Sequence, residues 1–181
     1  RRKLNQAQMS ANLVRIDAER GQVVQSWTLD DPFLSLRHLA RAPDGTLAVA
    51  MQAEHGDTAV REQAPLLALL DAAGLRVLDL PEGLSLRGYA GDVVYVAPGH
   101  GQPTGEGRFV VSANRAGALA SWSVTGAYLG LDDWREAGAL TARGDAWTAC
   151  GAQGALRLSA GQQVQQWAAP GLTWDNHAHR V

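Results

Sequence analysis

The tetrapeptide Leu34-Ser35-Leu36-Arg37 occurs twice in this chain of 181 residues. It returns unchanged as Leu84-Ser85-Leu86-Arg87. Looser copies follow at Leu140-Thr141-Ala142-Arg143 and Leu172-Thr173-Trp174-Asp175. The spacings of roughly 30–55 residues are typical of repeat architectures. The sequence is therefore read as a series of similar structural units.

Each unit is predicted to hold four short strands, because apolar runs alternate with turn signals rich in Gly, Pro, Asn and Asp. The run at 66–70 also fits a helix by periodicity, but its flanking Pro and Gly favour a strand. Four-stranded units of about 40–45 residues are typical of β-propeller blades. The predicted strands are a hairpin at 12–29, then 34–40, 46–52, 65–71 and 75–80, then 92–96, 108–112, 118–124 and 127–131, then 138–141, 147–150, 155–159 and 163–167.

The predicted fold is all-β: one WD-repeat-like β-propeller domain over residues 1–181, with about three and a half antiparallel blades present. A β-sandwich is the alternative, but it does not explain the repeated tetrapeptide. Half a ring leaves open sheet edges, which natural proteins avoid because unpaired strands aggregate. We therefore expect a missing N-terminal half or a second copy in a homo-oligomer to close the ring. The start at Arg1 without Met also suggests a fragment or a processed chain.

Composition excludes several classes of protein. The net charge of −2 argues against nucleic-acid binding, which needs a clustered basic excess. No window approaches 18 apolar residues, so the sequence predicts no membrane span. Cys150 is the single cysteine and cannot form an intrachain disulfide. No nucleophile motif or close carboxylate pair stands out in the sequence, which favours a protein that is not an enzyme.

The repeated arginines are the first candidates for a binding site. If the tetrapeptide begins the innermost strand of each blade, Arg37, Arg87 and Arg143 lie around one mouth of the central channel. Three guanidinium groups there would bind a carboxylate, a phosphate or a chelated anion. The alternative is structural, with each arginine pairing with a carboxylate of a neighbouring blade. Both interpretations remain open at this point.

Histidines offer a second candidate site. His177 and His179 are two residues apart and would face the same side of a strand. With His38 from another blade, they would form a nitrogen-rich metal site, although no cofactor is predicted as the first choice. His55 and His100 lie in polar loops and are expected to be solvated. The six tryptophans are expected to pack between blades rather than bind sugars.

Several segments resemble one known family. They are Lys3-Leu4-Asn5 with the strand at 12–17, Leu36-Arg37-His38-Leu39-Ala40 followed by Asp44-Gly45, and Trp174-Asp175-Asn176-His177. The chain resembles the C-terminal half of the bacterial domain-of-unknown-function family numbered fifteen-thirteen. The resemblance implies a seven-bladed propeller exported to the periplasm. Members are often encoded beside imelysin-type proteins and di-haem oxidoreductases implicated in iron uptake.

The resemblance directs the functional hypothesis. We expect a non-enzymatic periplasmic binding or scaffold module, acting with a protein partner in iron acquisition. The channel mouth would be lined by Arg37, His38, Arg87, Arg143, Asp175 and His177, and Lys3 and Asn5 join this set from the resembling segments. The alternative is a metal- or quinone-dependent oxidoreductase or hydrolase with its site over the channel.

Overall fold

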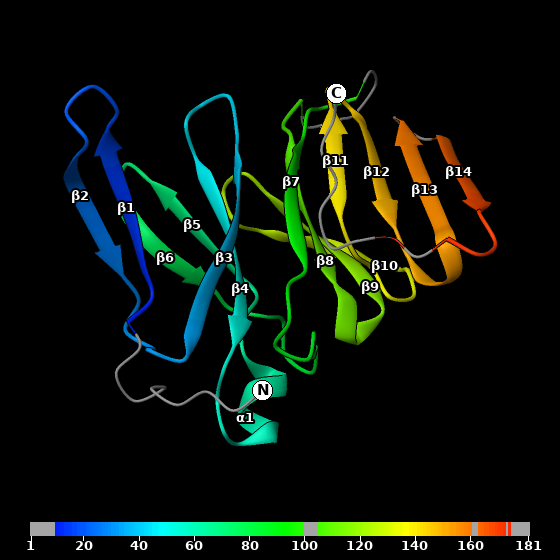
Figure 1. The fold of residues 1–181 in the computed structure, drawn as a ribbon, viewed down its shortest axis with the longest axis horizontal. Helices are drawn as coiled ribbons and strands as arrows, with labels where there is room; N and C mark the ends of the chain where they lie inside the picture. The colour runs from blue at the N-terminus through cyan, green and yellow to red at the C-terminus, as the bar shows by residue number, and fades with distance from the viewer. Residues whose placement is uncertain (1–9, 100–104, 161–162, 173, 175–181) are drawn as a thin grey trace.

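The computed structural model describes residues 10–99, 105–160, 163–172 and 174. Three antiparallel sheets of four strands and one sheet of two strands stand side by side (Figure 1). This arrangement confirms the predicted β-propeller of about three and a half blades. In each four-stranded sheet the strands neighbour one another in chain order.

The strand bounds follow the predicted alternation closely. The two-stranded sheet holds β1 (Asn12–Asp17) and β2 (Gln22–Thr28). The first complete blade holds β3 (Leu34–Arg41), β4 (Leu47–Ala53), β5 (Leu67–Asp71) and β6 (Gly74–Leu78). The second holds β7 (Asp92–Val96), β8 (Arg108–Ala113), β9 (Ala118–Ser123) and β10 (Tyr128–Asp133). The third holds β11 (Leu140–Arg143), β12 (Ala146–Cys150), β13 (Ala155–Ala160) and β14 (Gln163–Ala168).

Short helices interrupt this pattern. Helix α1 (Thr58–Gln63) forms in the loop between β4 and β5, and two 3-10 turns lie at Asn114–Ala116 and Ala152–Gly154. The Asp57 side chain caps α1 by accepting hydrogen bonds from the Ala59 and Val60 amides at 2.7 and 3.1 Å. No helix in the described part of the chain is long and apolar enough to cross a membrane.

The core lies between the blades. One cluster joins the first and second blades and includes Leu67, Phe109 and Trp122, which are fully buried. A second joins the second and third blades around Trp134 and Trp147. Trp122, Trp134 and Trp147 therefore pack between blades as predicted, whereas Trp167 on β14 is 49% exposed.

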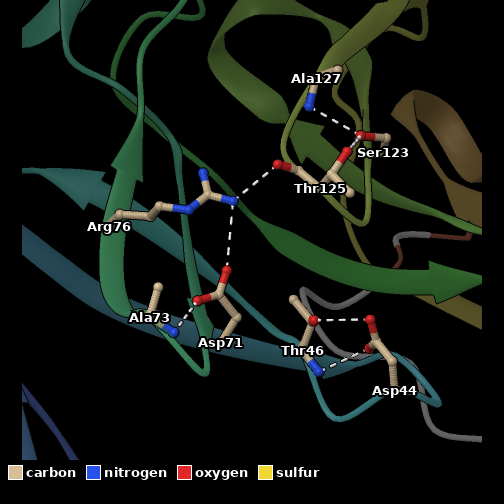
Figure 2. A network of polar contacts seen from close by, with 8 residues as sticks. All are labelled: Asp44, Thr46, Asp71, Ala73, Arg76, Ser123, Thr125 and Ala127. Atoms are coloured by element: carbon tan, nitrogen blue, oxygen red, sulfur yellow. Dashed lines mark hydrogen bonds and ion pairs between the residues drawn. The ribbon is translucent and has the colours of Figure 1, made fainter.

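A polar network fixes the outer turns of neighbouring blades (Figure 2). Arg76 on β6 donates a hydrogen bond to the Thr125 carbonyl oxygen in the turn between β9 and β10, at 2.9 Å. Its guanidinium also lies 3.7 Å from the Asp71 carboxylate, which accepts from the Ala73 amide at 2.8 Å. The Ser123 hydroxyl accepts from Ala127 in the equivalent turn at 3.0 Å. Arg76 thereby ties the first blade to the second.

The first strands of the three complete blades, β3, β7 and β11, lie next to one another (Figure 1). The Asp92 carboxylate at the start of β7 accepts from the Leu140 amide at the start of β11, at 2.9 Å. Just beyond the other end of β7, the Ala97 amide donates to the Gly144 carbonyl at 2.8 Å. Strands β7 and β11 therefore run in the same direction, and their two ends define two sides of the molecule.

Candidate functional site at the innermost strands

Arg37 lies at a bulge in β3. The register between β3 and β4 shifts between Leu36 and His38, so the residue between them has no partner in the ladder. The Arg37 Nη2 atom donates to the Glu54 Oε1 atom at 3.0 Å, and the Arg37 side chain is 39% exposed. Arg presents five N–H donors, so this single bond leaves donors directed to solvent.

The Asp92 carboxylate connects all three innermost strands. Its Oδ1 atom accepts from the Val93 amide at 2.8 Å and lies 3.8 Å from the His38 Nδ1 atom on β3. Its Oδ2 atom accepts from the Leu140 amide on β11. Asp92 thus contacts a histidine of the neighbouring blade, and among the described residues it pairs with none of the repeated arginines. Together, Arg37, His38, Glu54 and Asp92 form the inner-strand cluster.

The second copy of the tetrapeptide does not begin a strand, which corrects the sequence prediction. Residues 84–87 form a loop before β7, and Arg87 has a φ of 54°, a left-handed conformation. Gly88, Tyr89 and Ala90 then run beside the end of β4, where the Ala53 amide donates to the Gly88 carbonyl at 2.8 Å. The backbone of the second copy therefore follows a different path from the first. Arg87 is exposed and precedes β7.

Arg143 lies at the other end of the innermost strands, which is a second correction. It is the last residue of β11, directly before Gly144, whose carbonyl meets Ala97 beyond the end of β7. Arg37 instead lies beside His38, which contacts Asp92 at the start of β7. A strand of five residues spans roughly 13 Å between its first and last Cα atoms. The repeated arginines are thus not equivalent, and Arg143 belongs to the opposite side of the molecule.

The remaining predicted site residues lie outside the described residues. These are Lys3, Asn5, Asp175, His177 and His179, and His100 lies outside as well. The metal site that combines His38 with His177 and His179 stays a prediction. Within the described part of the chain, no group of three or more His, Cys, Asp or Glu side chains could hold a metal ion.

His55 is largely buried, not solvated as its polar loop suggested. Its side chain is 13% exposed, and its Nε2 atom lies 2.9 Å from the Asp31 Oδ2 atom. The Phe33 ring packs on it, with ring centroids 5.3 Å apart. Asp31 and Phe33 are 24 and 22 positions away in the sequence, and no local motif predicts this contact. Among the described residues, the His55 Nδ1 atom has no hydrogen-bond partner.

The Cys150 thiol is predicted to react slowly in the folded protein. The residue is 8% exposed, and burial raises the pKa of the thiol while its sulfur accepts from the Ala139 amide at 3.0 Å. A raised pKa keeps the thiol protonated near pH 8, and the protonated form is unreactive. We expect alkylation by iodoacetamide at pH 8 to be at least about tenfold slower than in denaturant. Equal rates, measured by mass spectrometry, would contradict the buried position.

Comparisons with known proteins support the fold. A family model described as "Protein of unknown function (DUF1513)" matches residues 1–181, which confirms the resemblance drawn from the motifs. Among curated proteins, no sequence matches the chain.

The structural neighbours include two lyases and one complex. A streptogramin B lyase structure matches with a TM-score of 0.56 and 12% identity over 84% of this chain and 46% of that chain. An inactive virginiamycin B lyase from Staphylococcus aureus with quinupristin matches with a TM-score of 0.57 and 13% identity, over 85% and 47%. BBS1N in complex with ARL6DN matches with a TM-score of 0.56 and 10% identity, over 89% and 48%. The chain spans about half the length of these structures, and at such low identity they show the fold alone.

Proposed function

We propose, on the premise that the chain belongs to the DUF1513 family, that it is a non-enzymatic binding or scaffold module of a periplasmic propeller, acting in iron acquisition. The observation that carries the proposal is the inner-strand cluster, where polar side chains from two blades meet at one end of the innermost strands. The periplasmic location and the link to iron come from the family resemblance.

The cluster is suited to an anionic ligand or an acidic surface of a partner protein. Arg37 keeps exposed N–H donors beside its bond to Glu54, and Arg87 is exposed in the loop on the same side. Guanidinium groups bind carboxylates and chelated anions through several parallel hydrogen bonds. His38 is held beside Asp92, which fixes its position on β3. Lys3, Asn5, Asp175 and His177 remain proposed members of the same mouth.

Arg143 has a different place in this proposal. Because it lies at the opposite end of β11, it would contact a ligand on the other side of the channel. The proposed mouth is therefore carried by Arg37 and His38 among the described residues, with Arg87 in the exposed loop that precedes β7.

Ferric citrate, an anionic iron chelate, is the first probe. We expect titration calorimetry to detect binding to the wild-type protein and Arg37→Ala to weaken it about tenfold, or about 1.4 kcal/mol, because a charged hydrogen bond is lost. Arg20→Ala is the matched control, since Arg20 lies in the turn between β1 and β2 with its side chain 74% exposed. Its affinity is expected to equal that of the wild type.

A titration with citrate alone separates a chelate site from a general carboxylate site. Equal binding of citrate and ferric citrate would support an anion site without a role in iron handling. No binding by the wild type, or equal binding by Arg37→Ala, would overturn the ligand-binding proposal. A stoichiometric metal in elemental analysis of the purified protein, lost in His177→Ala, would favour the metal-dependent enzyme instead.

A further inference from the structure

The two-stranded sheet corresponds to the outer half of a blade. In every complete blade, the chain runs from the innermost strand outward, so the third and fourth strands form the outer pair. The turn between β1 and β2 begins at Asp17, whose carboxylate accepts from the Glu19 and Arg20 amides at 3.0 Å. Asp71 accepts from the Ala73 amide in the same way at the start of the turn between β5 and β6. Strands β1 and β2 therefore occupy the third and fourth positions of a blade.

The edge of β1 that faces away from β2 has no neighbouring strand among the described residues. In the complete blades, this edge of the third strand pairs with the second strand, as β5 pairs with β4. Backbone N–H and C=O groups on a free edge are a template for another strand.

A groove of about 920 Å³ lies along this edge, between the two-stranded sheet and the first complete blade. Three consecutive residues of β1, Leu13–Arg15, line it, together with Trp27 on β2. Because successive side chains of a strand point to opposite faces, three consecutive residues place the strand edge, and not one face alone, at the groove.

The opposite wall of the groove carries apolar side chains of the first blade, of which Leu39 is the exposed one. Leu39 on β3 lines the groove and is 54% exposed, and Leu47 and Leu70 lie on the same wall. The matching space between the first and second blades is filled by a buried cluster that includes Phe109 and Trp122. The groove is thus an inter-blade space that two further strands would fill, and no strand of the described part of the chain occupies it.

Two arginines line the groove. Arg15 and Arg41 line it, and among the described residues neither makes a hydrogen bond or an ion pair. Asp44 and Asp71 also line the groove, but they accept hydrogen bonds from Thr46 and Ala73 in their own turns. The guanidinium groups favour carboxylates on whatever fills the groove.

We infer that the groove binds a two-stranded antiparallel β-hairpin, which adds to the free edge of β1 and completes a four-stranded blade. One strand pairs with β1, apolar side chains cover Leu39, and carboxylates face Arg15 and Arg41. Main-chain hydrogen bonds along the free edge of β1 supply the affinity, and the side chains of the hairpin that face the groove supply the specificity. This inference does not depend on the inner-strand cluster or its ligand.

A second copy of the described residues is a poorer occupant. Its three four-stranded sheets have no strand to spare, and its two-stranded sheet already holds the outer positions. The partner is therefore a polypeptide that offers two strands of its own, with alternating apolar and acidic residues.

A display library of disulfide-closed hairpins tests this inference. Each member has two strands of five alternating apolar and variable polar residues joined by Asn-Gly, a turn that favours hairpins. After selection on the wild-type protein, we expect clones enriched in Asp and Glu that bind Leu39→Asp at least about tenfold more weakly, since the new carboxylate removes the apolar contact and repels the acidic residues of the hairpin. Leu39 is exposed in the free chain, so Leu39→Asp is expected to fold normally.

The matched control is Leu129→Asp. Leu129 is 55% exposed on β10, outside the groove, and its substitution is expected to leave hairpin binding unchanged. Hydrogen exchange gives a second readout, because pairing at the free edge raises amide protection along Asn12–Asp17.

Three results would overturn the inference. The first is a selection that yields no binder, and the second is a set of binders equally sensitive to both Asp variants. The third is a wild-type protein that self-associates and becomes monomeric with Leu39→Asp, which would identify a second copy as the occupant.

Discussion

Trp122→Ala is expected to lower the free energy of unfolding by about 3–5 kcal/mol, the usual cost of removing a large buried aromatic side chain. Trp122 on β9 is fully buried in the cluster between the first and second blades. Its ring meets Tyr128 edge to face, with centroids 5.5 Å apart. The truncation leaves a cavity against both blades, so we expect thermal unfolding to shift downward by about 10 °C.

Two variants separate the causes of this loss. Trp167→Ala removes the same side chain from β14, where it is 49% exposed, and is expected to cost less than about 1 kcal/mol. Trp122→Phe keeps an aromatic ring and removes the Nε1 donor, which has no hydrogen-bond partner among the described residues. Its cost is expected to be smaller than that of Trp122→Ala. A similar Tm for Trp122→Ala and Trp167→Ala would contradict the assigned core.

The strands were predictable because their apolar runs are short and clearly bounded. In β8 and β9, apolar residues occupy both faces, and Gly or Pro marks the turns, so runs such as 108–112 and 118–124 stand out in the sequence. Helix α1 was not predictable in this way, because none of its residues is buried and it carries no apolar stripe. Its signal is the capping residue Asp57 alone, which is common in loops.

The repeated tetrapeptide predicted the blades better than it predicted the site. Leu34 of the first copy and Leu86 of the second are buried, and the other leucine of each copy packs partly buried against the core, so both copies contribute apolar side chains to it. Arg37 and Arg87 are exposed in both copies, and their positions depend on the backbone around them. The first copy forms the start of β3 and ends at its bulge, whereas the second ends in a turn with two left-handed residues, Arg87 and Gly88. The same four residues therefore adopt different backbone conformations in the two copies. The contacts that determine each conformation come from residues distant in the sequence.

The contact between His38 and Asp92 also could not be predicted from the sequence. The two residues are 54 positions apart and come from different blades. Predicting their contact requires the relative position of two adjacent blades, and no local sequence pattern specifies that position. Of this cluster, Arg37 and His38 were named from the sequence, and only the fold shows that Asp92 lies beside His38.

The segment that precedes β7 depends on Gly88, and Gly88→Ala is expected to destabilise the protein by about 3 kcal/mol. Gly88 is buried with a φ of +59°, a region that costs an L-residue about 1–2 kcal/mol. A Cβ atom there would overlap the Arg61 carbonyl oxygen and lie 2.9 Å from the Ala53 Cβ atom. Forcing this contact into a packed site adds about 1–3 kcal/mol.

Gly83→Ala is the matched control for the cost of placing an L-residue in the left-handed backbone conformation. Gly83 has a φ of +78° in the same connection, but a Cβ atom added there would meet no atom within 4 Å. It should therefore show the conformational cost alone, about 1–2 kcal/mol, and urea unfolding of the two variants measures the difference. An equal loss in both would mean that the space around Gly88 is open. A larger loss in Gly88→Ala means that close packing against α1 fixes the path of the chain between the first two blades, and with it the backbone conformation of the preceding residue, Arg87.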